Sequence, residues 1–507
     1  MKNYNPLLLI DFYKSTHHEQ YPKGLTKMVS YYTPRMSRLK DVDTITFFGL
    51  QAFIKEYLID GFDTMFFNRP EDEVVAEYER ILDYTLGKGA YESQKIRDLH
   101  KLGYLPLEIS AVPEGMATAV GVPQIEITNT HPDFVWLVNT IETMLSCTMW
   151  HTQVSAEVGK RYRKIVDEYV EKTCSPGVRA ARMLGDFSMR GQHCHESAMK
   201  ASAAWLCSFL NTATVPAILW LEDNYNCDIE TEEVGYGALS FEHSTVTSNY
   251  ALDGNEETLL KRALTEIYPN DNFSFLTDSY DHDNFLKNVI PACKDEILAH
   301  NGTILFRGDS GDPVTVVTDM VFVLWQIFGG TVNEKGYKVL DKHVKAIYGD
   351  SITPQRCKAI YEILESYGFS VENVVLGVGS FSFMCLEEVV DIDCYDGFGD
   401  PTTEQVIRFN PYTRDTFGYA IKATYGEDKI GAPVMIFKQP KGASWKKSPK
   451  GCIVVAADGQ SYTDEHTFEE AHGPAAENLL ELVFRDGKMI KETSLAEIRN
   501  RMYPEGF

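Results

Sequence analysis

Four short apolar runs rich in β-forming residues recur along the middle third of the chain and restrict the folds open to it. They span residues 273–276, 303–306, 344–348 and 374–376, and their ends are 30, 42 and 28 residues apart. Each run leads into a loop of small, polar or acidic residues and then into a segment with helical character. This spacing is typical of strand–helix units, which close into a doubly wound sheet or a (β/α) barrel with the chemistry in the loops after the strands.

The clearest of the helical segments follows the third run. Thr353 suits an N-cap, and Pro354 suits the first helical position. An apolar stripe at helical spacing then follows, formed by Ile360, Ile363, Leu364 and Tyr367. The sequence therefore predicts a helix over 353–367.

The two ends of the chain have a different pattern. Alternating apolar runs such as 107–112 and 434–437 are joined by Pro and Gly turns. We therefore predict a mixed α/β domain built from residues 1–145 and 413–507, with the α/β catalytic domain over 146–412 between them.

An acidic stretch at 386–405 interrupts the predicted catalytic domain. It holds seven carboxylates and no Lys or Arg: Glu387, Glu388, Asp391, Asp393, Asp396, Asp400 and Glu404. We expect an exposed, solvated loop inserted into the domain, in preference to a metal-binding segment.

Net charge argues against nucleic acid and membranes as partners. The 48 Lys and Arg against 73 Asp and Glu give a formal charge of −25, which repels polyanionic surfaces. No stretch approaches the roughly 18 apolar residues of a membrane span. Ten cysteines without a CxxC pair favour a reducing compartment, so we expect a cytoplasmic protein. His193, Cys194, His195 and Glu196 have no second cluster at ligand spacing, and we predict no metal-ligating residues.

Charged residues stand at the ends of the first two runs. Arg307, Asp309 and Asp312 lie within six residues, where an Arg fork can grip phosphate and a carboxylate can accept ribose hydroxyls or face an oxocarbenium ion. A structural ion pair closing a tight turn is the alternative. Asp278 and Asp281 form a second acidic pair, for which a helix N-cap is the alternative.

The loops after the last two runs are candidates for holding a phosphate on backbone N–H groups. They are Gly349-Asp350-Ser351 and Gly377 to Ser380, and tight turns without a ligand are the alternative. A basic segment at 438–450 has five lysines and no carboxylate, so it is either a solvated loop or a mobile loop that grips phosphate.

Two further motifs combine residues suited to catalysis. Phe187 and Arg190 could stack a planar ring and neutralise phosphate, although a packed Phe and a surface Arg fit equally well. His243 follows Glu242, a carboxylate able to orient the ring, whereas a lone His is more often structural.

Together these residues resemble a known family. Ten motifs stand in the order in which they occur in the nicotinamide phosphoribosyltransferase family: Asp11–His17, Tyr31–Arg35, Phe48–Gln51, Ala111–Gly115, Asp186–Gly191, Glu242–Thr245, Asp278–Asp281, Arg307–Gly311, Thr413–Asp415 and Phe484–Lys488. The resemblance runs from about residue 5 to 500. It implies a type II phosphoribosyltransferase with an irregular (β/α) barrel, which works as a homodimer with active sites at the subunit interface.

The resemblance also implies an activity. Family enzymes join nicotinamide to phosphoribosyl pyrophosphate with Mg²⁺, giving nicotinamide mononucleotide and pyrophosphate in NAD biosynthesis, and they hydrolyse ATP through a phosphohistidine. The resemblance implies that the catalytic residues are His243, Asp309, Asp278 and Arg307, and that the base binds to Phe187, Tyr13, Arg190 and Ala213. It implies that the phosphate and ribose bind to Arg307, Gly349, Asp350, Gly379 and Ser380. It implies that the pyrophosphate binds to Arg35, Arg414 and Lys422. His243 is the expected site of phosphorylation, and Tyr13 and the pyrophosphate group are expected from the other subunit.

The chain departs from the family pattern at the base pocket. Where the family has Gly-Thr-Asp-Thr, this chain has Asn211 to Thr214, so Ala213 replaces the carboxylate that accepts the amide proton of nicotinamide and repels nicotinate. At three further places the chain differs from the family pattern. It has Gly237-Ala238 where the family has Ser-Val, Gly308 where the family has Pro, and Ser380 where the family has Gly. Nicotinate phosphoribosyl transfer is therefore the main alternative. An inactive relative that binds pyridine nucleotides is the other.

Overall fold

The computed structural model describes residues 4–395, 401–442 and 446–507. The chain divides into two compact units. The first, here called the terminal unit, comprises Met1–Val154, Glu222–Cys227 and Thr413–Pro504. The second, the barrel unit, comprises Ser155–Leu221, Asp228–Tyr412 and Glu505–Phe507. The first change from one to the other falls inside the long helix α6 (Glu142–Thr173).

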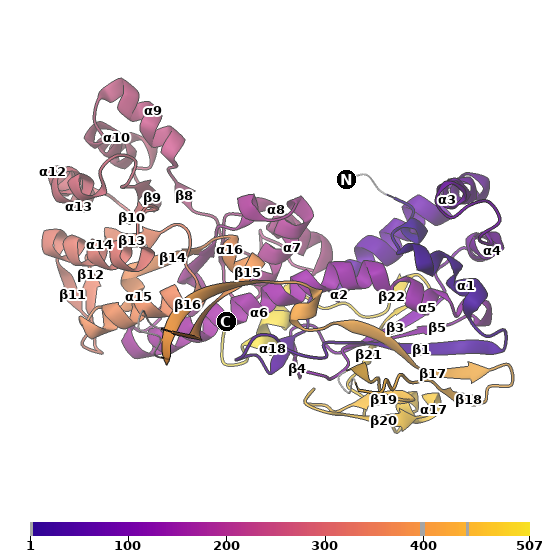
Figure 1. Cartoon of the computed structure of the whole chain (residues 1–507). Coiled ribbons are helices and arrows are strands. Elements are labelled where there is room, and N and C mark those ends of the chain that lie inside the picture. The colour runs from indigo at the N-terminus through magenta and orange to yellow at the C-terminus, as the bar shows by residue number, and fades with distance from the viewer. Residues whose placement is uncertain (1–3, 396–400, 443–445) are drawn as a thin grey trace. The chain divides into compact units, whose positions relative to one another are not determined.

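The terminal unit is built on a seven-stranded antiparallel sheet of order β18-β17-β1-β5-β3-β21-β22 (Figure 1). Its strands are β1 (Leu25–Thr33), β3 (Leu107–Ala111), β5 (Ile125–Asn129), β17 (Ala420–Asp428), β18 (Pro433–Met435), β21 (Glu481–Arg485) and β22 (Lys488–Met489). Since β1 pairs with β17, with Tyr31 opposite Lys422, the two ends of the chain share one sheet, as predicted.

Smaller elements complete the terminal unit. Its two further strand pairs are β2 (Thr44–Thr46) with β4 (Ala117–Ala119) and β19 (Cys452–Val455) with β20 (Tyr462–His466). Its helices are α1 (His17–Gln20), α2 (Leu50–Phe53), α3 (Glu71–Thr85), α4 (Gln94–Leu102), α5 (Leu137–Thr140), α17 (Phe468–His472) and α18 (Leu495–Met502).

The barrel unit contains a seven-stranded parallel sheet of order β7-β6-β14-β13-β10-β9-β8. The strands are β6 (Leu184–Asp186), β7 (Asn211–Thr212), β8 (Leu239–Ser240), β9 (Phe273–Leu276), β10 (Ile304–Gly308), β13 (Val344–Tyr348) and β14 (Val374–Val378). Tyr236, just before β8, forms a parallel bridge to Asn211 of β7, which brings the two edges of the sheet together into an irregular barrel. The predicted α/β barrel fold is therefore confirmed.

The four apolar runs form the strands β9, β10, β13 and β14, as predicted, and these four strands are neighbours in the sheet. Helix α15 (Pro354–Ser366) also begins as predicted, with Thr353 Oγ1 accepting the N–H of Arg356 at 3.3 Å. The other helices of this unit are α7 (His195–Leu206), α8 (Val215–Asn224, which ends in the terminal unit), α9 (His243–Asp253), α10 (Glu257–Arg262), α11 (His282–Asn284), α12 (Ile290–Ala292), α13 (Lys294–Ala299), α14 (Pro313–Phe328) and α16 (Phe381–Met384), and β11 (Gly330–Val332) pairs with β12 (Lys338–Leu340).

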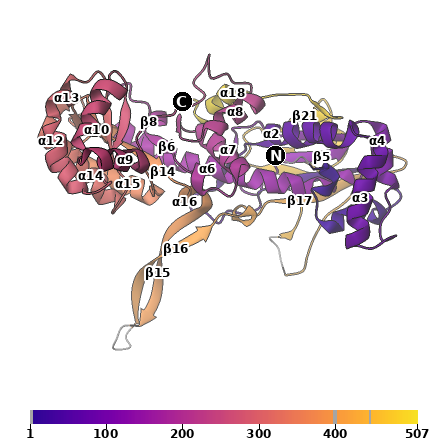
Figure 2. The ribbon, with the colours of Figure 1, turned by 90° about the horizontal axis from the view of Figure 1, so that it is seen from above.

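The acidic stretch is a β-hairpin, so the prediction of a loop is wrong. Strands β15 (Cys385–Tyr395) and β16 (Pro401–Pro411) pair along their whole length in antiparallel register, and Figure 2 shows them extending away from the barrel. Glu387, at the root, is buried. The β-branched residues Val389, Val390 and Ile392 favour a strand, and this preference outweighs the charge count in setting the backbone. Asp396 and Asp400 lie outside the described residues.

Among the described residues, no helix combines the length and the apolar character that crossing a bilayer requires.

Candidate active site

The carboxyl ends of the parallel strands meet at one rim of the barrel unit. Because all seven strands run in the same direction, residues that follow them converge there. Predicted site residues reach this rim from all seven strands, namely Phe187 after β6, Ala213 after β7, His243 after β8, Asp278 after β9, Arg307 and Asp309 at the end of β10, Gly349 and Asp350 after β13, and Gly379 and Ser380 after β14.

Arg307, Asp309 and Asp278 form one connected network. Arg307 Nη2 lies 3.2 Å from Asp309 Oδ2, and the N–H of Asp309 donates to Asp278 Oδ2 at 3.1 Å. Burial raises the pKa of the Asp309 carboxyl, with Arg307 acting to lower it and Asp278 to raise it further. Arg307 Nη1 also donates to Ser240 Oγ at 3.0 Å, a contact that no sequence pattern predicts.

His243 is oriented by Asp278. As the first residue of α9, it lies with Nε2 3.3 Å from Asp278 Oδ1, while its own side chain is 48% exposed and that of Asp278 only 3%. The expected orienting role of Glu242 is not seen: its carboxylate accepts from Ser244 Oγ, and its N–H donates to Thr245 Oγ1 at 3.2 Å. The neighbouring Asp281 caps α11 through the N–H of Asn284, so here the N-cap alternative is correct.

A buried carboxyl that the sequence analysis missed lies close to this pair. Glu256, at the N-cap of α10, is 6% exposed, and its Oε1 has no hydrogen-bond partner. Burial, together with the charges of Asp278 and Asp281, raises its pKa to about 7.

The two predicted phosphate loops are in contact with each other and with Asp309. The N–H of Gly349 donates to Asp309 Oδ1 at 3.1 Å. A Cβ at Gly379 would lie 2.0 Å from Asp350 Oδ1, so any larger residue there would displace this carboxylate. Asp350 Oδ1 also accepts the N–H of Ser351 at 2.7 Å.

Phe187 lies over two glycines at the mouth of the barrel. Gly185 of β6 is paired with Gly377 of β14, and a Cβ on these residues would lie 3.2 Å from Phe187 Cε2 and 2.7 Å from Phe187 Cδ2, respectively. The ring is half-buried, so part of it remains open for stacking.

Arg190 and Ala213 lie in the loops that follow β6 and β7. Arg190 is exposed, and the adjacent Gly191 contacts Ser380, whose Oγ would lie 1.9 Å from a Cβ there. Ala213 is exposed and donates its N–H to the carbonyl of Asp186 at 2.8 Å. Asp186 is fully buried and accepts from Ser188 N, Thr212 Oγ1 and Thr214 Oγ1. These hydrogen bonds connect the loop after β6 to the loop after β7.

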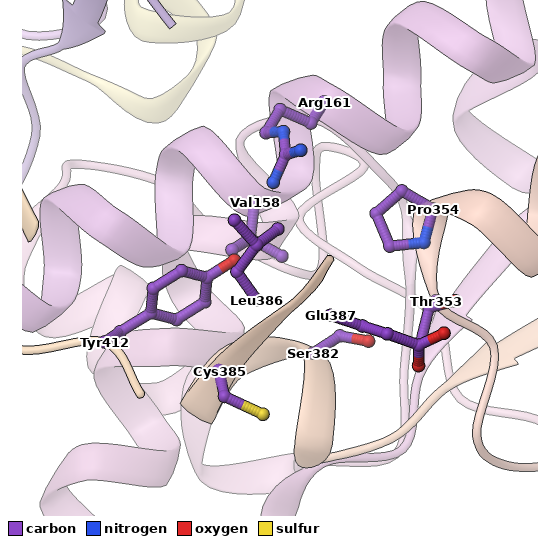
Figure 3. A pocket seen from close by; sticks show the side chains of 9 residues that line it. All are labelled: Val158, Arg161, Thr353, Pro354, Ser382, Cys385, Leu386, Glu387 and Tyr412. Atoms are coloured by element: carbon purple, nitrogen blue, oxygen red, sulfur yellow. The ribbon is translucent and has the colours of Figure 1, made fainter. Parts of the chain in front are cut away.

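A small cavity lies behind the phosphate loops in the barrel unit. It has a volume of about 10 Å³, enough for one water molecule at most. Figure 3 shows its lining, which comes from α6, the start of α15, α16 and the hairpin root: Val158, Arg161, Thr353, Pro354, Ser382, Cys385, Leu386, Glu387 and Tyr412.

The predicted pyrophosphate residues gather within the terminal unit. Burial and the charge of Arg414 lower the pKa of Arg35. Burial also lowers the pKa of Lys422, and Arg35, Lys438 and Arg414 act in the same direction against Glu142. These four cations are therefore close enough for their positive charges to repel one another. Lys438 comes from the basic segment, of which residues 443–445 lie outside the described residues.

Tyr13 belongs to the same unit and is exposed. The residue is 62% exposed, and its hydroxyl donates to Asp11 Oδ2 at 3.2 Å. Thr143 Oγ1 donates to the same carboxylate oxygen at 2.7 Å, which holds Asp11 in place. The charge of Arg414 acts on the Tyr13 hydroxyl, so these two residues are near one another.

Comparison with family models gives two matches. Residues 5–83 match the N-terminal domain of nicotinamide phosphoribosyltransferase, and residues 183–389 match the nicotinate phosphoribosyltransferase family.

Two similar relatives span almost the whole chain. A nicotinamide phosphoribosyltransferase of Acinetobacter baylyi is 35% identical over 98% of this chain and 97% of its own length. One of Xanthomonas campestris pv. campestris is 30% identical over the same shares.

Solved structures share the fold at low sequence identity. Nicotinate-nucleotide pyrophosphorylase from Pyrococcus furiosus aligns with a TM-score of 0.56 at 13% identity, over 99% of this chain and 95% of its own. Human nicotinic acid phosphoribosyltransferase aligns with a TM-score of 0.55 at 16% identity, over 97% and 93%.

Proposed function

Because the chain belongs to the nicotinamide phosphoribosyltransferase family, we propose that it transfers the phosphoribosyl group of phosphoribosyl pyrophosphate to nicotinamide. The products are nicotinamide mononucleotide and pyrophosphate, and the reaction serves NAD biosynthesis. The observation that carries this proposal is the connected network of Arg307, Asp309, Asp278 and Gly349 beside the half-buried ring of Phe187.

The rim residues are suited to the chemistry of this reaction. Departure of pyrophosphate leaves positive charge on the ribose, which the half-buried carboxylate of Asp309 stabilises from close by. Arg307 neutralises phosphate oxygens, and Asp350, Gly379 and Ser380 line the binding place of the ribose phosphate. Phe187 stacks on one face of the pyridine ring.

We propose a homodimer with shared active sites. The exposed ring of Tyr13 would close over the other face of the base, and Arg35, Arg414 and Lys422 would bind the pyrophosphate, each from the partner subunit. The gathering of these cations in the terminal unit supports this assignment, because a bound polyanion would relieve their mutual repulsion.

Mg²⁺ and ATP are the proposed cofactor and coupled substrate. Mg²⁺ usually binds substrate phosphates, waters and one or two carboxylates, and Asp309 and Asp278 are the carboxylates at the rim. When bound, it neutralises the charge of the leaving pyrophosphate. His243 would accept the phosphoryl group of ATP, with Asp278 holding Nε2 and the half-exposed ring leaving Nδ1 as the acceptor. We place the enzyme in the cytoplasm, a proposal that the nine described cysteines, none in a disulfide, support.

A two-substrate assay tests the proposal. Purified protein with phosphoribosyl pyrophosphate and Mg²⁺ should form the mononucleotide from nicotinamide. Product from nicotinate alone would favour the second candidate, nicotinate phosphoribosyl transfer, for which the exposed methyl of Ala213 is the specific observation. No product from either base refutes both.

The variant Ala213→Asp tests the base pocket directly. A carboxylate at this position would accept the amide N–H of nicotinamide and repel the carboxylate of nicotinate. We expect the ratio of kcat/KM for nicotinamide over nicotinate to rise by about tenfold or more, as one charge-assisted hydrogen bond warrants. An unchanged ratio means that residue 213 does not contact the base.

A further inference from the structure

Ser351 has an unusual backbone conformation directly after the phosphate loop. Its φ is 59°, in the left-handed region that glycine enters freely and that a residue with a Cβ avoids. Such conformations persist only where surrounding contacts hold them, and they concentrate at functional sites.

Arg356 supplies one of these contacts. It lies in the first turn of α15, and its Nη1 donates to the carbonyl of Ser351 at 2.7 Å. The next carbonyl, that of Ile352, accepts from Tyr162 Oη at 2.6 Å, and Tyr162 Oη also lies 2.8 Å from Ser382 Oγ. The exit of the loop is therefore held at two successive carbonyls.

The root of the hairpin holds Arg356 in turn. Glu387 Oε2 lies 3.9 Å from Arg356 Nη2, and the Glu387 carbonyl accepts from Gln355 Nε2 at 2.9 Å. In Figure 3 the Glu387 side chain runs toward the start of α15, beside Thr353 and Pro354. Glu387 is 8% exposed, which limits the arrangements open to the pair.

We propose that Arg356 is a positioning residue that holds Ser351 in the left-handed conformation, and thereby holds the loop 349–351 ready for the ribose phosphate. Glu387 anchors Arg356, so the hairpin root contributes to the shape of the site. The role in phosphate binding rests on the proposed function. The contact between Arg356 and the Ser351 carbonyl does not depend on that function.

Kinetics of Arg356→Met test the inference. The variant keeps the length of the aliphatic stem and removes the donor. We expect the KM for phosphoribosyl pyrophosphate to rise about tenfold, since loss of a charged hydrogen bond releases a strained residue. The KM for the base should change less than twofold. Lys358→Met is the matched control, because Lys358 lies on the same helix, exposed and paired with Glu362, and should behave as wild type.

Rescue by Ser351→Gly separates positioning from a merely structural role. Glycine needs no partner to keep φ near 59°. The double variant Ser351→Gly/Arg356→Met should therefore recover most of the lost affinity for phosphoribosyl pyrophosphate. A defect in Arg356→Met that glycine leaves unchanged, or no defect at all, overturns the proposal.

Hydrogen exchange decides the question independently of activity. Amides in peptides covering 349–353 should exchange about tenfold faster in Arg356→Met than in wild type, and at the wild-type rate in Lys358→Met. Equal rates in all three proteins overturn the role of Arg356. If wild type forms no mononucleotide while exchange responds as expected, the proposed function fails and the loop contact stands.

Discussion

Gly377 is the position where a single methyl group would disturb the base and phosphate regions together. In Gly377→Ala the new Cβ would lie 2.7 Å from Phe187 Cδ2 and 2.7 Å from the carbonyl oxygen of Gly349. Non-bonded carbon atoms normally stay about 3.5–4.0 Å apart, so the ring and the carbonyl would each have to withdraw by about 1 Å.

Neither neighbour can withdraw freely. Phe187 also lies against Gly185, and the N–H of Gly349 is tied to Asp309, which pairs with Arg307. Inserting a methyl into such a region costs about 1–3 kcal/mol. If that cost falls on the transition state, kcat/KM drops by about 5- to 150-fold.

Steady-state kinetics with each substrate varied in turn should show the loss for both the base and phosphoribosyl pyrophosphate. Gly24→Ala is the matched control, because no heavy atom lies within 4 Å of a Cβ there, and its kinetics should stay within twofold of wild type. A Gly377→Ala enzyme with wild-type kcat/KM for both substrates would refute the packing argument.

Three further predictions concern other parts of the site. His243→Asn should abolish ATP-dependent labelling of the protein while leaving base-dependent transfer detectable; labelling that persists would place the phosphoryl group elsewhere. Lys422→Met should raise the KM for phosphoribosyl pyrophosphate about tenfold and reduce its salt dependence, and unchanged salt dependence would count against a pyrophosphate role. Glu256 has a pKa of about 7 in the folded protein against an ordinary 4.5, so the stability that its carboxyl contributes is complete below pH 4.5 and is lost as the pH rises to about 7. The difference in urea unfolding free energy between Glu256→Gln and wild type should therefore grow over this range by up to about 3 kcal/mol. Parallel pH curves for the two proteins would contradict the assignment.

The fold followed from local signals because buried parallel strands leave a strong pattern. The runs at 273–276 and 344–348 are strands with those same bounds, and Thr353 with Pro354 located the start of α15. The hairpin did not follow, because a charge count over 386–405 ignores the β-branched residues Val389, Val390 and Ile392, which favour strand structure.

The site residues were found by type, but their partners were not. His243 is oriented by Asp278, 35 residues away, and not by its neighbour Glu242. Glu256 lacked any motif, since its raised pKa arises from burial and from carboxylates that tertiary structure brings near it. Long-range pairing of this kind leaves no spacing pattern along the chain.

The pairing of Cys385 with Pro411 has a consequence for the history of the chain. Residues directly opposite in an antiparallel pair are about 5 Å apart, so the hairpin starts and ends at nearly the same point in space. It adds length to the polypeptide without separating the residues on either side of it. Its outer part can therefore be lengthened, shortened or exchanged by evolution or by design, while the barrel strands before it keep their positions.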